Sequence, residues 1–189
     1  MFSTASGGEG VQSEYQGGKI TLAQNGEILG QNDEIGLGLP LSDLEAEPLT
    51  LTAASDRQAT WTPLGTRSEA EWTFDYDPAG NPVMPVSVVE LSLPGIIDGT
   101  VAAGTVQEAR LEFATQPGAD DQACASMTFA VSFDDGATWT EVAIDRTGDT
   151  ATAAIALPVD AAFGSVRFTA ADENGNTVAH ETIRSFAIA

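Results

Sequence analysis

The sequence is poor in cysteine, histidine and positive charge. Its 189 residues include one cysteine, Cys124, and one histidine, His180, and only 7 lysines and arginines against 28 aspartates and glutamates. A single cysteine excludes a disulfide within the chain, so stability has to come from burial of apolar side chains. The same scarcity disfavours a zinc site, which takes its ligands from several such side chains.

The net charge is −21. Such a surface repels the phosphates of nucleic acids and the headgroups of anionic lipids, and no cluster of basic residues offsets it. No apolar stretch reaches the roughly 18 to 20 residues that a transmembrane helix needs. We therefore expect neither nucleic-acid binding nor membrane insertion. The first residues lack the basic start and apolar block of a signal peptide, so we expect any signal sequence to lie outside this chain.

The chain nevertheless has the composition of a folded protein, with 42% hydrophobic and 19% charged residues. Helix signals are scarce, whereas short stretches of alternating apolar and polar residues recur between glycines, prolines, asparagines and aspartates. The sequence therefore predicts an all-β fold. Seven strands are expected after residue 80, at about 84–93, 109–113, 127–133, 142–144, 151–157, 166–170 and 177–188. Their number and length favour an immunoglobulin-like β-sandwich, in which the inward faces of two sheets share one core.

The first 80 residues are less regular. Residues 19–29 read as a hairpin, because Asn25-Gly26 suits the positive φ angles of a two-residue turn. Two more strands are expected at 48–53 and 71–76, which is a thin core for an independent domain. The two prolines and the glycine of residues 77–82 suggest a boundary. We therefore predict a small β region at 1–79 that packs on a sandwich at 80–189.

The most specific local motif is Ser132-Phe133-Asp134-Asp135-Gly136-Ala137-Thr138-Trp139, which has the spacing of an Asp-box. In this motif the aspartate accepts N–H groups of a tight turn, the glycine takes positive φ and the tryptophan folds over the turn. Sialidases carry one such box per propeller blade, but this chain has a single box and too few residues for a propeller. We interpret the motif as a hairpin that caps itself.

Residues 172–176 place oxygen-bearing side chains around a glycine, as a calcium loop does. The candidate ligands are Asp172, Asn174 and Asn176. The spacing of an EF-hand is absent, and the same residues suit an ordinary turn between the last two strands. The turn is our main interpretation and calcium binding the alternative. We assign no other cofactor, no other metal ligand and no catalytic residue from the sequence.

Single residues that catalysis would require have plainer explanations. His180 lies in the predicted strand 177–187, and no nucleophile motif occurs elsewhere, so we expect it to face solvent. Cys124 is expected to be a small buried side chain rather than a reactive thiol. The aromatic residues favour core packing over a platform for sugar rings, since Trp72 alternates with Phe74 as inward residues do. The candidates for such a platform are Trp61, Trp72, Trp139, Tyr15 and Tyr76.

Three stretches taken together, residues 66–74, 131–139 and 164–184, carry a family resemblance. They contain Arg67 followed by Trp72-Thr73-Phe74, the Asp-box hairpin, and a strand and turn with Gly175-Asn176 that ends at Ile183-Arg184. In order and spacing they resemble the C-terminal, non-catalytic β-domains of secreted subtilisin-family serine peptidases from actinobacteria. The similarity covers about residues 15–189. Ser185-Phe186 departs from the Ala-Tyr of that family, and the Asp, His and Ser blocks of the peptidase are absent.

The resemblance implies an accessory module rather than an enzyme, outside the cell or on its surface. Its partners would be the peptidase domain of the parent chain, and in addition a protein substrate or a cell-surface polymer. It would stabilise the peptidase, hold it near the surface or contact substrate. The alternatives are a carbohydrate-binding module, an adhesin spacer stiffened by calcium, and a small hydrolase built around His180.

Overall fold

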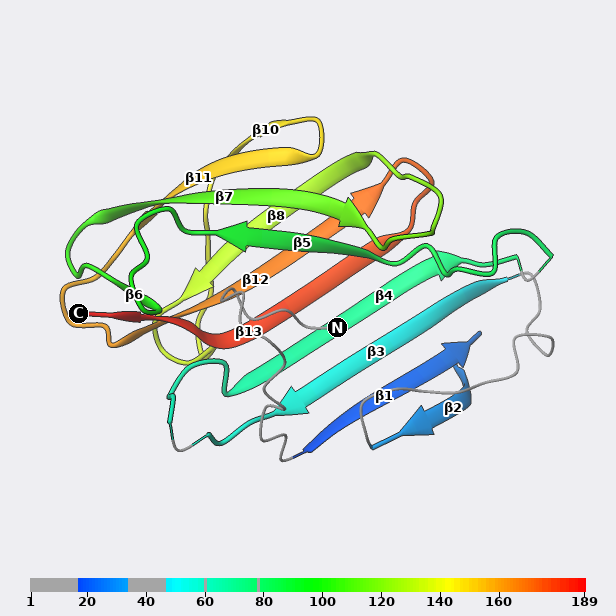
Figure 1. Ribbon diagram of the computed structural model, residues 1–189, viewed down its shortest axis with the longest axis horizontal. Helices are drawn as coiled ribbons and strands as arrows, with labels where there is room; N and C mark the ends of the chain where they lie inside the picture. The colour runs from blue at the N-terminus through cyan, green and yellow to red at the C-terminus, as the bar shows by residue number, and fades with distance from the viewer. Residues whose placement is uncertain (1–16, 34–46, 60, 78) are drawn as a thin grey trace.

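The computed structural model describes residues 17–33, 47–59, 61–77 and 79–189. These residues form an all-β structure in which a small sheet packs on one face of a much wider sheet (Figure 1). The strands before residue 80 are β1 (Gly17–Gln24), β2 (Glu27–Asn32), β3 (Pro48–Asp56) and β4 (Arg67–Asp75). The later strands are β5 (Ser87–Ser92), β6 (Thr100–Val101), β7 (Val106–Thr115), β8 (Cys124–Ser132), β9 (Thr140–Glu141), β10 (Ile144–Thr147), β11 (Thr150–Ala156), β12 (Phe163–Asp172) and β13 (Thr177–Ile188).

The strand order after residue 80 is that of an immunoglobulin domain. The small sheet runs β10-β11-β7-β5, and β13-β12-β8 lie side by side in the wide sheet. Labelled A to G along the chain, with β9 and β6 left out, these strands form the sheets ABED and CFG of the constant-type fold. The short β6 pairs in parallel with the end of β13. The predicted immunoglobulin-like sandwich is therefore confirmed.

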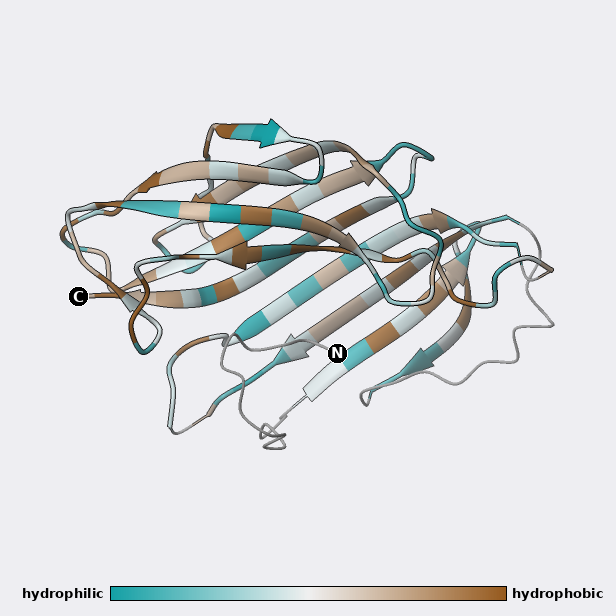
Figure 2. Ribbon diagram, turned by 45° about the horizontal axis from the view of Figure 1, so that its top comes forward, coloured by the Kyte–Doolittle hydropathy of each residue, from teal (hydrophilic) through white to brown (hydrophobic). Residues whose placement is uncertain are grey.

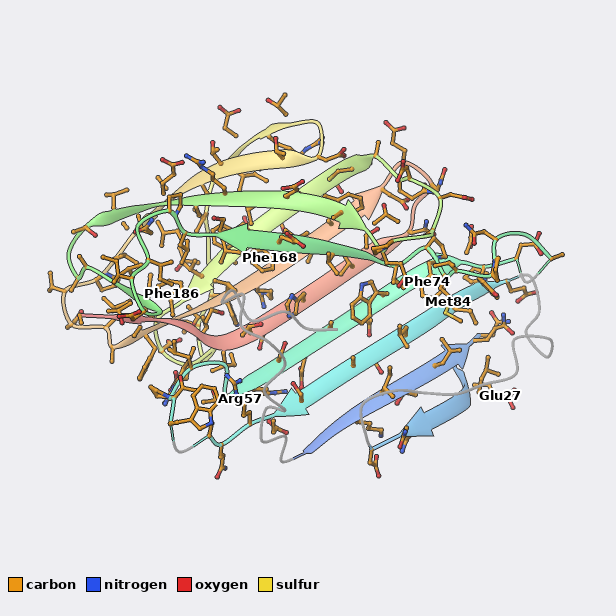
Figure 3. The ribbon with its side chains drawn as sticks, in the orientation of Figure 1. Glu27, Arg57, Phe74, Met84, Phe168 and Phe186 are labelled. Atoms are coloured by element: carbon orange, nitrogen blue, oxygen red, sulfur yellow. The ribbon has the colours of Figure 1, made fainter. Side chains whose placement is uncertain are left out.

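The core lies between the two sheets and follows the alternation in the sequence. In β7 and β11 every second side chain is buried, and Figure 2 shows the matching change between hydrophilic and hydrophobic residues along β7. Phe129 and Phe168 stack with ring centroids 5.3 Å apart, and Phe186 is fully buried. A Cβ on Gly164 would come within 2.1 Å of the Phe186 ring, so this position of β12 requires glycine. Phe168 is among the side chains that fill the space between the sheets in Figure 3.

The strands before residue 80 extend the wide sheet. β4 pairs with β13 over seven residue pairs, from Arg67 opposite Ile183 to Thr73 opposite Thr177, and β3, β1 and β2 follow in order. The wide sheet thus continues from the sandwich into this region through β4. The predicted hairpin is confirmed, with φ of 51° at Asn25 and 80° at Gly26. The division at residue 79 stays a prediction, and hydrogen bonding runs across it.

One predicted strand is wrong. Residues 142–144 were expected to form a single strand, but the chain changes sheets at this point. β9 pairs with β8 in the wide sheet, and β10 pairs with β11 in the small sheet. Val142 donates its N–H to the carbonyl of Phe129 between the two strands. Val142 and Ile144 are both partly buried against the core, so the apolar alternation continues although the strand does not.

Candidate functional site

The Asp-box residues form a closed hydrogen-bond network at the hairpin that follows β8. Asp134 accepts two bonds from Thr138, one from the backbone N–H at 2.8 Å and one from the hydroxyl at 2.6 Å. Ser132 donates its hydroxyl to Asp134 at 2.7 Å and accepts the N–H of Gly136 at 2.9 Å. Asp135 and Gly136 take positive φ, 56° and 85°. The self-capped hairpin expected from the sequence is confirmed.

These hydrogen bonds determine the protonation state of the Asp134 carboxyl group. The hydroxyl of Thr138, its backbone N–H and the hydroxyl of Ser132 all favour the charged carboxylate and lower the pKa of Asp134 to about 2. A carboxylate with so low a pKa is ionised near neutral pH and does not act as a general acid there. The motif aspartate therefore serves the local fold.

The hairpin is attached to the neighbouring strands through two arginines. Arg184, at a φ of 56° in β13, donates to both carboxylate oxygens of Asp135, at 2.9 and 2.7 Å, and lies over the ring of Phe163. The Arg184 hydrogen bond holds the pKa of Asp135 below its usual value. Arg167 of β12 lies over the Trp139 ring, 4.7 Å from its centroid. Residues from the second and third resemblance stretches thus contact one another.

The three resemblance stretches lie next to one another in space. Their strands β4, β13, β12 and β8 occupy consecutive positions in the wide sheet. The hydroxyl of Ser165, which is buried at the start of β12, accepts the N–H of Arg184 at 3.0 Å. Sequence reasoning did not assign a role to Ser165, because a serine between apolar residues gives no sign of a distant partner. The stretches form one continuous surface of strands and one hairpin.

The candidate calcium residues form a turn between β12 and β13. Asp172 is 2% exposed, and its carboxylate accepts the N–H groups of Asn174 and Asn176 at 2.9 Å and the side-chain amide of Asn176 at 2.7 Å. Asn176 accepts the N–H of Asp75 through its own oxygen. The turn interpretation is confirmed. Calcium binding stays a prediction, and a calcium ion would have to replace these hydrogen bonds.

His180 does not face solvent as the sequence analysis expected. It lies on the inner side of β13, partly buried, opposite Phe168 in β12 and Ala70 in β4. Its Nε2 is 3.0 Å from the hydroxyl of Ser68 and 3.2 Å from that of Thr182. Burial lowers the pKa of His180, which favours the neutral ring. The sequence did not reveal this position, because the polar residues Glu181 and Thr182 beside His180 interrupt the alternation of apolar and polar residues along the strand.

The Ser68–His180 contact has one feature of a nucleophile and its base, but the surroundings of Ser68 differ from those of an acyl-transfer site. Such a site also needs N–H donors aimed at the developing oxyanion, usually at a turn or helix start. Ser68 lies inside β4, which is paired with β3 on one side and β13 on the other. Its backbone is therefore part of the sheet ladder. In the described part of the chain the contact is best explained as hydrogen bonding between neighbouring strands.

Cys124 is buried, as predicted, and lies beside a contact between the two sheets. It is 6% exposed, and burial raises the pKa of its thiol, which disfavours the reactive thiolate. Asp149, in the turn between β10 and β11, accepts the Cys124 N–H at 2.7 Å. Arg146 of β10 donates to the carbonyls of Cys124 and Ala125 at 2.9 Å. These bonds join the small sheet to the start of β8.

The aromatic residues do not share one face. Trp72 and Tyr76 are buried, as expected for core residues, and the Trp72 indole donates to the carbonyl of Ser87 at 2.6 Å. Trp139 lies beneath Arg167. Trp61 was also expected in the core, but it is 64% exposed on the β3–β4 loop, where Arg57 lies over its ring. Figure 3 places Arg57 at this loop, away from the core. Tyr15 lies outside the described residues.

Sequence reasoning missed a group of exposed apolar side chains at one end of the sandwich. Seven large apolar side chains are exposed in the described residues, and five belong to the loops and strand start at the end where β3, β5 and β11 finish (Figure 1). We call these five the end patch: Trp61, Ile96, Ile97, Val106 and Val159. Ile97 is 75% and Val159 81% exposed. An apolar pair in a loop flanked by glycines was the signal that could have revealed it.

Comparison with protein-family models, with curated proteins and with solved structures finds no match to this chain. Among the described residues, no group of three or more histidine, cysteine or acidic side chains is arranged to hold a metal ion. The same residues include no helix suited to crossing a membrane. Two shallow depressions lie on the outer face of the small sheet, lined in part by Glu108 and by Glu90, and His180 belongs to neither.

Proposed function

We propose that this chain is a non-catalytic accessory region of a secreted subtilisin-like serine peptidase and that it works by contact with another folded domain. The end patch carries this proposal. Exposed apolar side chains gathered at one place on a soluble protein mark interaction surfaces, whereas scattered ones do not. Here they come from separate loops and one strand start at the same end of the structure.

The loops that carry the end patch are held in place by close packing. A Cβ on Gly99 would lie 2.8 Å from the Leu64 side chain, and one on Gly104 would lie 2.8 Å from Val159. Both glycines have positive φ. Loops fixed in this way lose little conformational entropy on binding, which favours a preformed contact surface. Asp98 and Asp160 follow Ile97 and Val159 in the chain, so the surface offers acidic groups beside its apolar ones.

The motif residues support the same proposal from another direction. The carboxylates of Asp134 and Asp172 are engaged in turns, and Arg184 anchors the hairpin. Side chains used to build turns are not available for bond making. The extracellular location and the link to a peptidase rest on the three resemblance stretches, which lie on adjacent strands.

The test compares hydrogen exchange in the natural gene product and in the isolated 189-residue chain. We expect peptidase blocks in the natural product, and slower exchange there than in the isolated chain for loops 57–66, 94–99 and 157–162. Equal exchange in these loops would refute contact through the end patch. A neighbouring domain of another kind, with the loops protected, would refute only the peptidase assignment.

A small hydrolase is the second candidate, because Ser68 lies 3.0 Å from His180. Turnover of ester or amide substrates by the purified chain, abolished in both Ser68→Ala and His180→Ala, would establish it. We expect no turnover, and unchanged background rates in both variants.

A further inference from the structure

We infer that the free edge of β5 is a binding site for an extended peptide that alternates apolar and basic residues. β5 is the last strand of the small sheet, and among the described residues it pairs only with β7. An unpaired strand edge offers main-chain donors and acceptors to an incoming strand, which is a common way of binding peptides. This inference concerns a surface apart from the end patch and does not depend on the proposed function.

The register identifies which groups of β5 point outward. The carbonyl of Val86 accepts the N–H of Gln116, which follows β7, so Val86 belongs to a hydrogen-bonded pair. In an antiparallel ladder these pairs alternate with non-bonded ones. The N–H and C=O groups of Val88 and Glu90 therefore point toward β7, and those of Val89 and Leu91 point to the open edge.

The indole of Trp72 supports this register independently. It donates to the carbonyl of Ser87, which has the same parity as Val89 and Leu91. The outward direction at this parity is thus toward β4 and away from β7. Within the described residues, no hydrogen bond reaches the outward groups of Val89 and Leu91. These two residues form the open part of the edge, bounded on one side by the contact to Trp72.

The charges beside this edge specify the occupant. Glu90 lies directly opposite Glu112 of β7 on the outer face of the small sheet, and like charges in this position destabilise a sheet. Arg110 lies on the same face but donates to Glu108 at 2.7 Å. A strand added at the edge would place its residue opposite Glu90 in a non-bonded pair, where side chains approach most closely. Lysine or arginine there would offset the repulsion.

The alternation of buried and exposed residues in β5 predicts where the apolar residues of the peptide lie. Ser87 and Val89 are buried toward the core and Leu91 is partly buried, whereas Val88 and Glu90 are exposed. A strand paired in register with them has every second side chain on the inner side, near Trp72, and these should be apolar. A second copy of this chain fits poorly, since each copy carries a net charge of −21 and would bring Glu90 to the same edge.

The probe is a short synthetic peptide that alternates valine and lysine, titrated into the full chain at low salt and followed by NMR. We expect slower amide exchange at Val89 and Leu91. A peptide with N-methylated valines keeps its charge but cannot form the ladder. We expect its affinity to be lower by about tenfold or more. A peptide of the same composition with valines and lysines in separate blocks should lose a similar amount.

Matched variants test the charge argument. Glu90→Gln and Glu141→Gln change the net charge equally, but only Glu90 lies on the edge strand, whereas Glu141 is exposed on β9 of the other sheet. We expect Glu90→Gln to weaken binding about threefold and Glu141→Gln to leave it nearly unchanged. The inference is overturned if the N-methylated peptide binds as well as the first one, or if both variants weaken binding equally, because the peptide would then bind through net charge alone. Absence of binding at millimolar peptide, or dimers formed through β5, would also overturn it.

Discussion

The strands before residue 80 and those after it are paired in the same sheet but buried to different degrees. β7 and β11 alternate cleanly between buried and exposed residues, while most residues of β1 and β3 are neither fully buried nor fully exposed. Both β1 and β3 are hydrogen-bonded on both sides, as β7 and β12 are. Backbone pairing is therefore similar in the two regions, and the difference lies in side-chain burial. This difference in burial indicates that the sandwich supplies most of the stability and that the earlier strands depend on the sandwich through β4.

The largest expected effect comes from shortening a side chain in the centre of the sandwich. Phe129 is 1% exposed and stacks on Phe168, so Phe129→Ala should lower the free energy of unfolding by about 3–5 kcal/mol. Leu51 of β3 is only partly buried, and Leu51→Ala should cost less than half as much. Urea unfolding followed by circular dichroism measures both. Equal losses would contradict the comparison.

A smaller loss is expected at the contact that joins the two regions. Trp72→Phe removes the N–H that bonds the Ser87 carbonyl and leaves this acceptor without its partner, at a cost of about 1–3 kcal/mol. Because β4 connects the earlier strands to the sandwich, the variant should also speed amide exchange in β3. The control is Trp61→Phe, an exposed position where we expect little change in either measurement. If β3 exchange is unaffected, the dependence on β4 is wrong.

The Asp-box hairpin should be less sensitive to loss of its ion pair. Arg184→Ala removes both bonds to Asp135, which are partly exposed to solvent, and should cost about 0.5–1 kcal/mol. Arg184→Gly removes the same bonds but suits the φ of 56° better, so it should cost less than alanine. Thermal unfolding of both variants and of Asp135→Asn measures this. A larger loss for glycine than for alanine would mean that the backbone conformation is not strained.

The smallest effect is one of pH. Hydrogen bonds lower the pKa of Asp134 from 3.8 to about 2, so its carboxylate makes its full contribution to the stability of the folded state above pH 3.8. That contribution falls as the pH drops through this range and is lost below about 2. Asp134→Ala should therefore show a weaker fall in stability between pH 4 and pH 2 than the wild type, as measured by urea midpoints. Identical pH profiles would show that the turn bonds do not favour the charged form.

Much of the fold follows from local patterns in the sequence. Period-two alternation located the strands of the sandwich, and Asn25-Gly26 located a hairpin turn. The pairing of β4 with β13 could not be predicted, because it joins residues more than a hundred positions apart and no pattern in either strand identifies the strand with which it pairs. The split at residues 142–144 was missed because apolar side chains on both sides of a sheet change keep the same alternation.

The site residues were predictable where the chemistry is local. The Asp-box and the Asp172 turn are closed by hydrogen bonds within four residues, so spacing alone described them. The Arg184–Asp135 pair joins a strand to a distant hairpin turn, and the Ser68–His180 contact joins two strands, so both depend on pairing that the sequence does not specify. The exposure of Trp61 depends on loop packing and was also missed.

Native-state hydrogen exchange tests the central claim most directly, namely that side-chain burial in the sandwich, rather than strand pairing, determines stability along the chain. β1 and β12 are each paired on both sides, so their amides differ mainly in the burial around them. We expect the amides of Val166 and Phe168 in β12 to exchange only by global unfolding, and those of the partly buried Ile20 and Thr21 in β1 to exchange at a clearly lower free energy. Equal protection of the two strands, or greater protection of β1, would contradict the account.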